Sequence, residues 1–329
     1  MNVADFFCGC GGFGKGFHNS GFKVKIATDI WSDALQSHEL NFPGTEHILG
    51  DISNENCKQQ IQKICSEEEI DVFIGGPPCQ SFSSAGKRDE NDPRGQLFFD
   101  YIELVDRIKP KIVVAENVKG ILTMKFGDVF VTKKITDSFS KIGYNCEFRL
   151  LNAADYGVPQ TRQRVIFIAT RLDIDILPVD CFPKQTHKSA NYKTVRQSID
   201  DLADLEDDES FNHVRTKHSD SFKKRLLDTK FGESATPKYK EAFFKLWPDK
   251  PALTVKGNNG GVFLHYRDPR VMTARELARL QSFPDSYRFF GRKGSVYKQL
   301  GNAVPVGLSS AIADQIKNIL LSKKRKRTI

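Results

Sequence analysis

Short apolar runs alternate with segments of helical periodicity through residues 1–170. An apolar run bounded by turn residues predicts a strand, and apolar positions three and four residues apart predict a helix. The predicted strands are Val3–Phe7, Lys23–Thr28, Asp71–Ile74, Lys111–Ala115, Tyr144–Leu151 and Arg164–Ala169. The predicted helices are a segment ending near Ser20, then Trp31–Leu40, Asn54–Cys65 and Leu97–Ile108. Apolar strands alternating with helices predict an α/β fold, with a mostly parallel sheet covered on both faces.

The pattern changes after Arg171. Residues 172–270 show no clear alternation and are rich in Asp, Lys, Asn and Pro, which predicts a smaller, irregular unit rich in β structure and loops. Residues 273–283 return to a helical pattern, and Val304–Leu321 predicts a last amphipathic helix. We therefore expect one unit at residues 1–170, a second at 171–272, and a segment at 273–329 that returns to the first.

A glycine-rich turn follows the first predicted strand. Gly9, Gly11 and Gly14 match the spacing of a nucleotide-binding turn, although this spacing alone is weak evidence. Asp29 ends the second predicted strand, where a carboxylate can accept the two hydroxyls of a ribose. Asp51 follows a probable third strand, where an acid could receive an adenine amino group. The set indicates an adenosine-containing ligand and leaves both NAD and S-adenosylmethionine open.

One of the cysteines stands in unusual surroundings. The chain has 7 cysteines without zinc-ligand spacing, so we expect reduced thiols and no metal site. Cys79 directly follows Pro77 and Pro78 at the end of a predicted buried strand, and this stiff turn is suited to aiming a nucleophile. The polar segment after it, residues 81–94, has the composition of a loop that closes over a substrate.

Charged side chains stand at the ends of two other predicted strands. Glu116 directly follows the strand Lys111–Ala115, so its carboxyl should share a rim with Cys79 and is a candidate proton donor. Arg162 and Arg164 precede the last strand. Because residues two apart in an extended chain point the same way, both should face a substrate or backbone phosphates.

The overall charge is positive. A net charge of +8 and a pI near 9.0 favour a polyanionic partner such as nucleic acid. No run approaches the roughly 18 apolar residues of a membrane span, and the N-terminus lacks a basic leader. We therefore expect a cytoplasmic protein without a membrane partner, and a monomer.

Several segments, taken in order, resemble the cytosine-carbon-5 DNA methyltransferase family of bacterial restriction–modification systems. They are residues 5–12, 75–83, 92–98, 116–118, 160–164, 275–284 and 301–305, so the resemblance covers nearly the whole chain. It implies a Rossmann-like methyltransferase fold that uses S-adenosylmethionine to methylate a flipped-out cytosine in duplex DNA. The compact size of the chain, with little beyond the catalytic and recognition units, leads us to expect that it protects host DNA from a cognate restriction endonuclease in the bacterial cytoplasm.

The resemblance implies residue roles at the active site. Cys79 would be the nucleophile, Glu116 would hold the cytosine ring, and Arg164, with Arg162 beside it, would contact that ring. The implied S-adenosylmethionine site consists of Phe7, Gly9, Gly11, Gly12, Asp29, Ile30, Asp51, Ile52, Pro78, Leu97, Asn302 and Val304. Ile30 stands where the family frequently has a bulky aromatic residue, so we expect weaker adenine packing unless Trp31 assists.

The resemblance also assigns DNA recognition to residues 171–272, with the helix at 273–283 as its structural support. The candidate DNA contacts are Ser83, Lys87, Arg88, Arg94, Thr254, Lys256, Asn258 and Arg267. Asn259, His265 and Arg270 also stand near glycines and could read bases. Ordinary loop polarity explains each of these residues, taken singly, at least as well.

Three other functions compete with this one. A tRNA cytosine methyltransferase on the same scaffold usually carries a Cys-Phe-Thr segment, whereas this chain has Cys181-Phe182-Pro183. A non-catalytic DNA-binding relative would not need Cys79, Glu116 and Arg164 together. An NAD-dependent oxidoreductase would explain the glycines but not the Pro-Pro-Cys loop. Methyl transfer to DNA accounts for all of these features.

Overall fold

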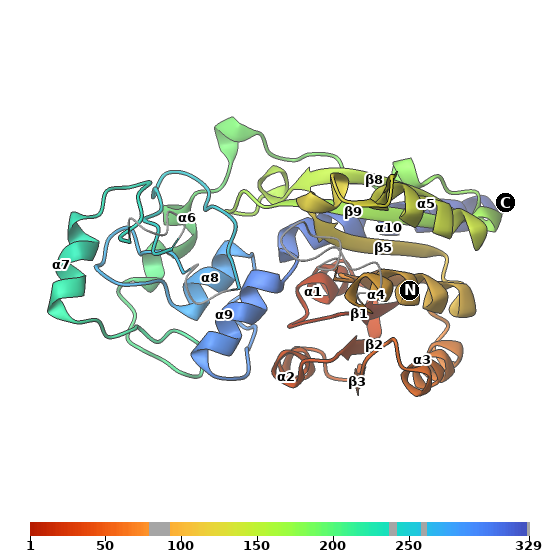
Figure 1. Ribbon diagram of the computed structural model, residues 1–329, viewed down its shortest axis with the longest axis horizontal. Helices are drawn as coiled ribbons and strands as arrows, with labels where there is room; N and C mark the ends of the chain where they lie inside the picture. The colour runs from red at the N-terminus through yellow and green to blue at the C-terminus, as the bar shows by residue number, and fades with distance from the viewer. Residues whose placement is uncertain (79–92, 237–241, 258–261, 328–329) are drawn as a thin grey trace.

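The computed structural model describes residues 1–78, 93–236, 242–257 and 262–327, of which 93–95 and 324–327 are described by their backbone alone. Figure 1 shows two lobes, one built around a central sheet and the other built from short helices and long loops. We call them the sheet lobe and the helix–loop lobe.

The sheet has seven strands in the order β3-β2-β1-β4-β5-β9-β8. Their bounds are β1 Asn2–Phe6, β2 Lys23–Asp29, β3 Glu46–Leu49, β4 Val72–Gly75, β5 Ile112–Val118, β8 Tyr144–Asn152 and β9 Gln163–Arg171. β9 runs antiparallel to both of its neighbours, and the remaining pairs are parallel. This confirms the predicted mostly parallel sheet. Since β2 and β4 flank β1 on opposite sides, the strand order reverses at β1, where ligands bind in open sheets.

Helices cover both faces of this sheet, as predicted. α1 (Gly12–Asn19) and α10 (Val306–Arg327) bury Phe13, Phe17 and Leu308 against one face. On the other face α3 (Glu55–Glu67), α4 (Pro93–Ile108) and α5 (Val131–Lys141) bury Ile61, Tyr101 and Ile135. α2 (Ser32–Asn41) lies beside β2 and β3 (Figure 1). Apolar contact on both faces explains why the central strands are continuously apolar.

The helix–loop lobe contains α6 (Val195–Ile199), α7 (Asp220–Asp228), α8 (Ala274–Leu280) and α9 (Lys293–Asn302). Among the described residues of 172–272, β structure is limited to isolated bridges, so the irregular character is present but the expected β structure forms no strand. The sequence pattern did not predict α9, although its side chains Val296, Tyr297 and Leu300 are buried. It begins without a side-chain cap, which leaves little local signal in the sequence.

α8 joins distant loops through buried charged groups. Arg275 is fully buried and donates hydrogen bonds to the carbonyl oxygens of Phe211 (2.9 Å), Pro284 (3.1 Å) and Tyr287 (2.6 Å). Glu276 completes a capping box with Thr273 at the start of the helix. The helix therefore organises the loops on both sides of it, and Leu277 and Leu280 place it in the core of the lobe.

Candidate active site and cofactor site

The glycine turn after β1 lies at the carboxyl edge of the sheet and has an unusual backbone conformation. Phe7, Gly9 and Gly11 have positive φ angles of 52°, 53° and 85°. The amide of Gly9 donates to Asp29 Oδ2 (2.8 Å), and the amide of Trp31 donates to Asp29 Oδ1 (2.9 Å). Asp29 thus ties the glycine turn to the end of β2, as expected for two segments that form one nucleoside site.

Close packing explains why two positions of this turn are glycine. A Cβ on Gly11 would lie 2.5 Å from the Tyr287 hydroxyl, and one on Gly12 would lie 2.3 Å from the Val304 carbonyl. A Cβ on Gly9 would meet nothing within 4 Å, so the turn borders open space there. The structure therefore brings the glycine turn against the segment that carries Asn302 and Val304, close to the opposite end of the chain.

The other predicted cofactor residues differ in what they can offer. The side chain of Ile30 is 71% exposed, and that of Asp51 is also exposed. Ile52 is buried in the core, so only its backbone is available to a ligand. The half-buried residues of the set are Phe7, Pro78 and Leu97. The Trp31 ring lies under the ammonium of Lys298, with 4.7 Å between that nitrogen and the ring centroid.

Glu116 and Arg164 form an ion pair next to the end of β4. Arg164 Nε lies 2.6 Å from Glu116 Oε1, and both side chains are 12% exposed. Glu116 lies inside β5 instead of after it, because pairing with β9 continues from Ala115 to Val118. A Cβ on Gly76 would lie 3.4 Å from Glu116 Oε2. The structure thus brings the predicted carboxylate and guanidinium together beside the backbone that leads to Cys79.

Asn117 positions that backbone, although the sequence assigned it no role. Its side chain is 3% exposed, and its Nδ2 donates to the Pro77 carbonyl (3.0 Å). Because Asn117 neighbours Glu116, one segment of β5 supplies both the carboxylate and the support for the Pro-Pro turn. Cys79 itself lies outside the described residues.

Arg162 does not face a substrate rim. Its side chain is 1% exposed and donates to the carbonyl oxygens of Val255 (2.9 Å) and Gly301 (2.8 Å). Burial, with the nearby charge of Arg164, lowers the Arg162 pKa to about 9. The expectation that both arginines face the substrate is therefore wrong for Arg162, since segments far away in the sequence cover it. We assign Arg162 a positioning role, because it links the start of β9 to Val255 and to Gly301 of α9.

Some of the predicted DNA contacts lie outside the described residues, and the others differ in how accessible they are. Ser83, Lys87, Arg88, Asn258 and Asn259 lie outside the described residues, as does the Arg94 side chain at the start of α4. Thr254 lines a hollow of about 580 Å³ together with Arg164, and Lys256 is half-buried. Arg267 is exposed but forms an ion pair with Asp204 (2.6 Å). An arginine held by a carboxylate has to leave that partner before it can bind DNA.

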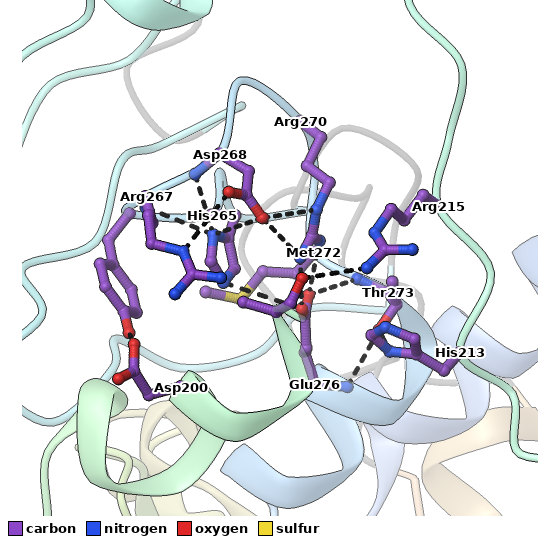
Figure 2. A network of polar contacts seen from close by, with 12 residues as sticks. Asp200, His213, Arg215, His265, Arg267, Asp268, Arg270, Met272, Thr273 and Glu276 are labelled. Atoms are coloured by element: carbon purple, nitrogen blue, oxygen red, sulfur yellow. Dashed lines mark hydrogen bonds and ion pairs between the residues drawn. The ribbon is translucent and has the colours of Figure 1, made fainter. Parts of the chain in front are cut away.

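His265 and Arg270 are buried within a polar network, so the expectation that they read bases is wrong. Figure 2 shows them around Glu276 of α8. Arg270 donates to both carboxylate oxygens of Glu276 (2.9 and 2.7 Å). Nδ1 of His265 accepts from the amides of Arg267 (3.3 Å) and Asp268 (3.1 Å). These groups hold the loop together instead of facing a ligand.

The described part of the chain lacks two further features. It holds no cluster of three or more His, Cys, Asp or Glu side chains that could bind a metal ion. None of its helices combines the length and the apolar character needed to cross a membrane.

A mostly parallel sheet with a glycine turn and polar groups at the carboxyl ends of its strands is typical of α/β enzymes that bind a nucleoside. The sequence model of the C-5 cytosine-specific DNA methylase family matches residues 1–318. The chain belongs to this family and is an enzyme that methylates DNA at carbon 5 of cytosine. The resemblance found from the sequence segments is thereby confirmed.

Relatives match along nearly the full chain. Type II methyltransferase M.DdeI of Desulfomicrobium norvegicum is 34% identical, over 96% of this chain and 88% of that protein. Type II methyltransferase M.NgoPII of Neisseria gonorrhoeae is also 34% identical, over 97% and 96%. Among solved structures, a prophage-encoded E. coli protein described as a DNA modification methyltransferase has a TM-score of 0.81 at 29% identity, over 98% and 99% of the chains. The S. pombe Dnmt2 methyltransferase, at 21% identity and a TM-score of 0.71, shares the fold.

Two buried titratable groups lie beneath the glycine turn. Asp5 of β1 is 1% exposed, and no side chain among the described residues donates a hydrogen bond to its carboxylate. His38 is fully buried, with Nε2 3.8 Å from Asp5 Oδ2 and Nδ1 2.8 Å from His47 Nε2. Burial raises the pKa of Asp5 well above its ordinary value, and burial lowers the pKa of His38 to about 3. Burial thus disfavours the charged form of both groups beneath the turn.

Asp5→Asn should change how stability depends on pH. Because the folded protein raises the pKa of Asp5, protonated Asp5 stabilises the fold below the unfolded pKa, and this contribution is lost as pH rises through the folded pKa. Between the unfolded pKa of about 4 and the raised folded pKa of Asp5, the free energy of unfolding of the wild type should therefore fall relative to the variant by about 1.4 kcal/mol per pH unit. Chemical denaturation of both proteins from pH 4 to 9 measures this difference, and a difference independent of pH would contradict a buried neutral Asp5.

Proposed function

We propose that this methyltransferase uses S-adenosylmethionine and attacks a flipped-out cytosine of duplex DNA with Cys79. The observation that carries the proposal is the Glu116–Arg164 pair, which lies beside the Gly76–Pro78 backbone at the sheet edge that also holds the glycine turn. Membership of the C-5 cytosine-specific DNA methylase family supports the chemistry.

The residues at the turn fit an adenosine-containing cofactor. Open space borders Gly9, and the exposed side chains of Ile30 and Asp51 stand at the ends of neighbouring strands. Asp29 keeps lone pairs for ribose hydroxyls while it accepts the two backbone amides. When bound there, S-adenosylmethionine supplies the methyl group that carbon 5 accepts. Asn302 and the Val304 backbone would close the far side of this site.

The chain's own residues would make carbon 5 reactive. The Cys79 thiolate attacks carbon 6 of cytosine, which moves electron density onto carbon 5 and nitrogen 3. Glu116 accepts a hydrogen bond from the exocyclic amine and holds a proton at nitrogen 3, while Arg164 fixes the direction of the carboxylate. After carbon 5 has accepted the methyl group, a base takes the carbon 5 proton. The electron pair of that C–H bond forms the carbon 5–carbon 6 double bond, and the carbon 6–sulfur bond breaks to release the Cys79 thiolate.

Recognition would come from residues 171–272, with α8 as their support and residues 1–170 as the catalytic unit. A cytosine in a duplex has to be flipped out at a cost of a few kcal/mol before it can reach the site. The relatives named as type II methyltransferases support a role within a restriction–modification system. We infer that the enzyme acts as a monomer in the bacterial cytoplasm and protects host DNA.

Transfer of a labelled methyl group to duplex DNA tests this proposal, and bisulfite sequencing then maps the cytosines that are modified. Wild-type protein should methylate cytosine within one short sequence. Cys79→Ser should abolish turnover and should no longer form a covalent adduct with duplex DNA that carries 5-fluorocytosine at the mapped position.

Three outcomes would contradict the proposal. Transfer to tRNA with none to any DNA would assign the chain to RNA. An adduct that persists in Cys79→Ser would assign the nucleophile to another residue. DNA binding without any transfer would favour a non-catalytic relative.

Glu116→Gln should lower kcat by roughly 100- to 1,000-fold, because an amide cannot hold the proton at nitrogen 3. Affinity for duplex DNA should change little, since the side chain is mostly buried at the site. Glu147→Gln is the matched control, because Glu147 is an exposed carboxylate on β8. Single-turnover rates at saturating DNA and cofactor measure the effect, and a Glu116→Gln rate equal to the control would remove Glu116 from the chemistry.

A further inference from the structure

We propose that residues 184–193, with the ends of β8 and β9, form a binding surface for the sugar–phosphate backbone of the duplex beside the methylated cytosine. This inference rests on the proposed function, because it extends the DNA site away from the Glu116–Arg164 pair.

Two neighbouring hollows share part of their lining, and we call them together the trough. The first, of about 580 Å³, begins at the catalytic pair and is lined by Val118, Lys119, Gly120, Asn152, Thr161, Gln163, Arg164 and Thr254. The second, of about 420 Å³, is lined by Leu150, Asn152, Asp155, Gln163, Gln185, His187, Lys188, Ser189 and Tyr192. Asn152 and Gln163 line both hollows, so the two hollows lie side by side, with Arg164 in the first and Lys188 in the second.

The wall formed by residues 185–192 is held in place by one residue. Asp155 accepts hydrogen bonds at its carboxylate from Gln185 Nε2 (2.8 Å) and the Tyr192 hydroxyl. Its carbonyl accepts from the amides of Thr186 (3.0 Å) and His187 (2.9 Å). The segment is therefore built before any ligand arrives, which lowers the entropy cost of binding.

Unneutralised positive charge gathers on this segment. Lys184, Lys188 and Lys193 are exposed, and none of them forms an ion pair within the described part of the chain. On the acidic side of the helix–loop lobe, by contrast, Arg267 pairs with Asp204 and Arg279 pairs with Asp201. Free lysines bind phosphates as point charges, whereas paired arginines first have to lose their partners.

Neutral hydrogen-bonding groups complete the trough. The Gln163 side chain is exposed and makes no hydrogen bond among the described residues, so its amide nitrogen can donate to a phosphate oxygen. The chain passes here from β9 toward α6, at the junction of the two lobes (Figure 1). A duplex whose target base reaches Arg164 would therefore meet amides first and lysines farther along its backbone. Such contacts set position and carry no sequence information.

Removal of the lysines tests this surface through the salt dependence of binding. Affinity is measured between 50 and 200 mM salt for wild type and for Lys184→Ala/Lys188→Ala/Lys193→Ala, with a duplex that contains the mapped target sequence and one that lacks it. The triple variant should bind both duplexes about 10-fold or more weakly at 100 mM salt. The slope of log affinity against log salt should become shallower by about 0.9 for each phosphate that the variant no longer neutralises.

Lys63→Ala is the control, because Lys63 is an exposed lysine on α3, away from the trough. It should match the wild type in affinity and slope. A triple variant that matches Lys63→Ala would overturn the inference, and so would a loss confined to the target duplex, which would make the segment a base reader. Wild-type methyl transfer to the same target duplex is measured alongside, so that failure of this surface is distinguished from failure of the proposed function.

Discussion

The buried guanidinium of Arg162 is the interaction on which the arrangement of the site depends. It joins the start of β9, the segment at Val255 and the end of α9 at Gly301. A buried charge is tolerated only where hydrogen bonds replace its hydration, so these carbonyls have to stay where they are. Gln160 reinforces the junction by accepting from the Val255 amide (2.9 Å) and donating to the Leu280 carbonyl (3.1 Å). The junction lies two residues from Arg164 and one from Asn302, so it positions both the Glu116–Arg164 pair and the rim where we propose that the cofactor binds.

The cofactor edge combines this charged junction with a turn that rests on two buried titratable groups. Burial raises the pKa of Asp5 and lowers that of His38 beneath the glycines, while Asp29 accepts the backbone amides of Gly9 and Trp31. Gly12 packs against Val304 too closely for any side chain. Both ends of the chain therefore have to fold before the cofactor site exists.

Local sequence pattern was sufficient for the sheet and for most of the helices that cover it. It placed Glu116 and Arg164 at one rim, and the structure pairs them there. It misjudged Arg162, whose partners lie 93 and 139 residues away, because no local signal reveals such contacts. The prediction that His265 and Arg270 read bases was wrong for the same reason, because their burial depends on contacts with Glu276 of α8. The unpredicted α9 is likewise defined by packing against the helix–loop core.

The most direct test of this account is Arg162→Lys, with two readouts from one folded protein. Lysine keeps the charge but lacks the planar fork that reaches both carbonyls. Loss of one charge-assisted buried hydrogen bond should weaken S-adenosylmethionine binding and lower kcat on duplex DNA together, each by about 10-fold or more. Calorimetry of cofactor binding and single-turnover methylation measure the two quantities. A variant that keeps both at wild-type values would contradict the central role of this junction.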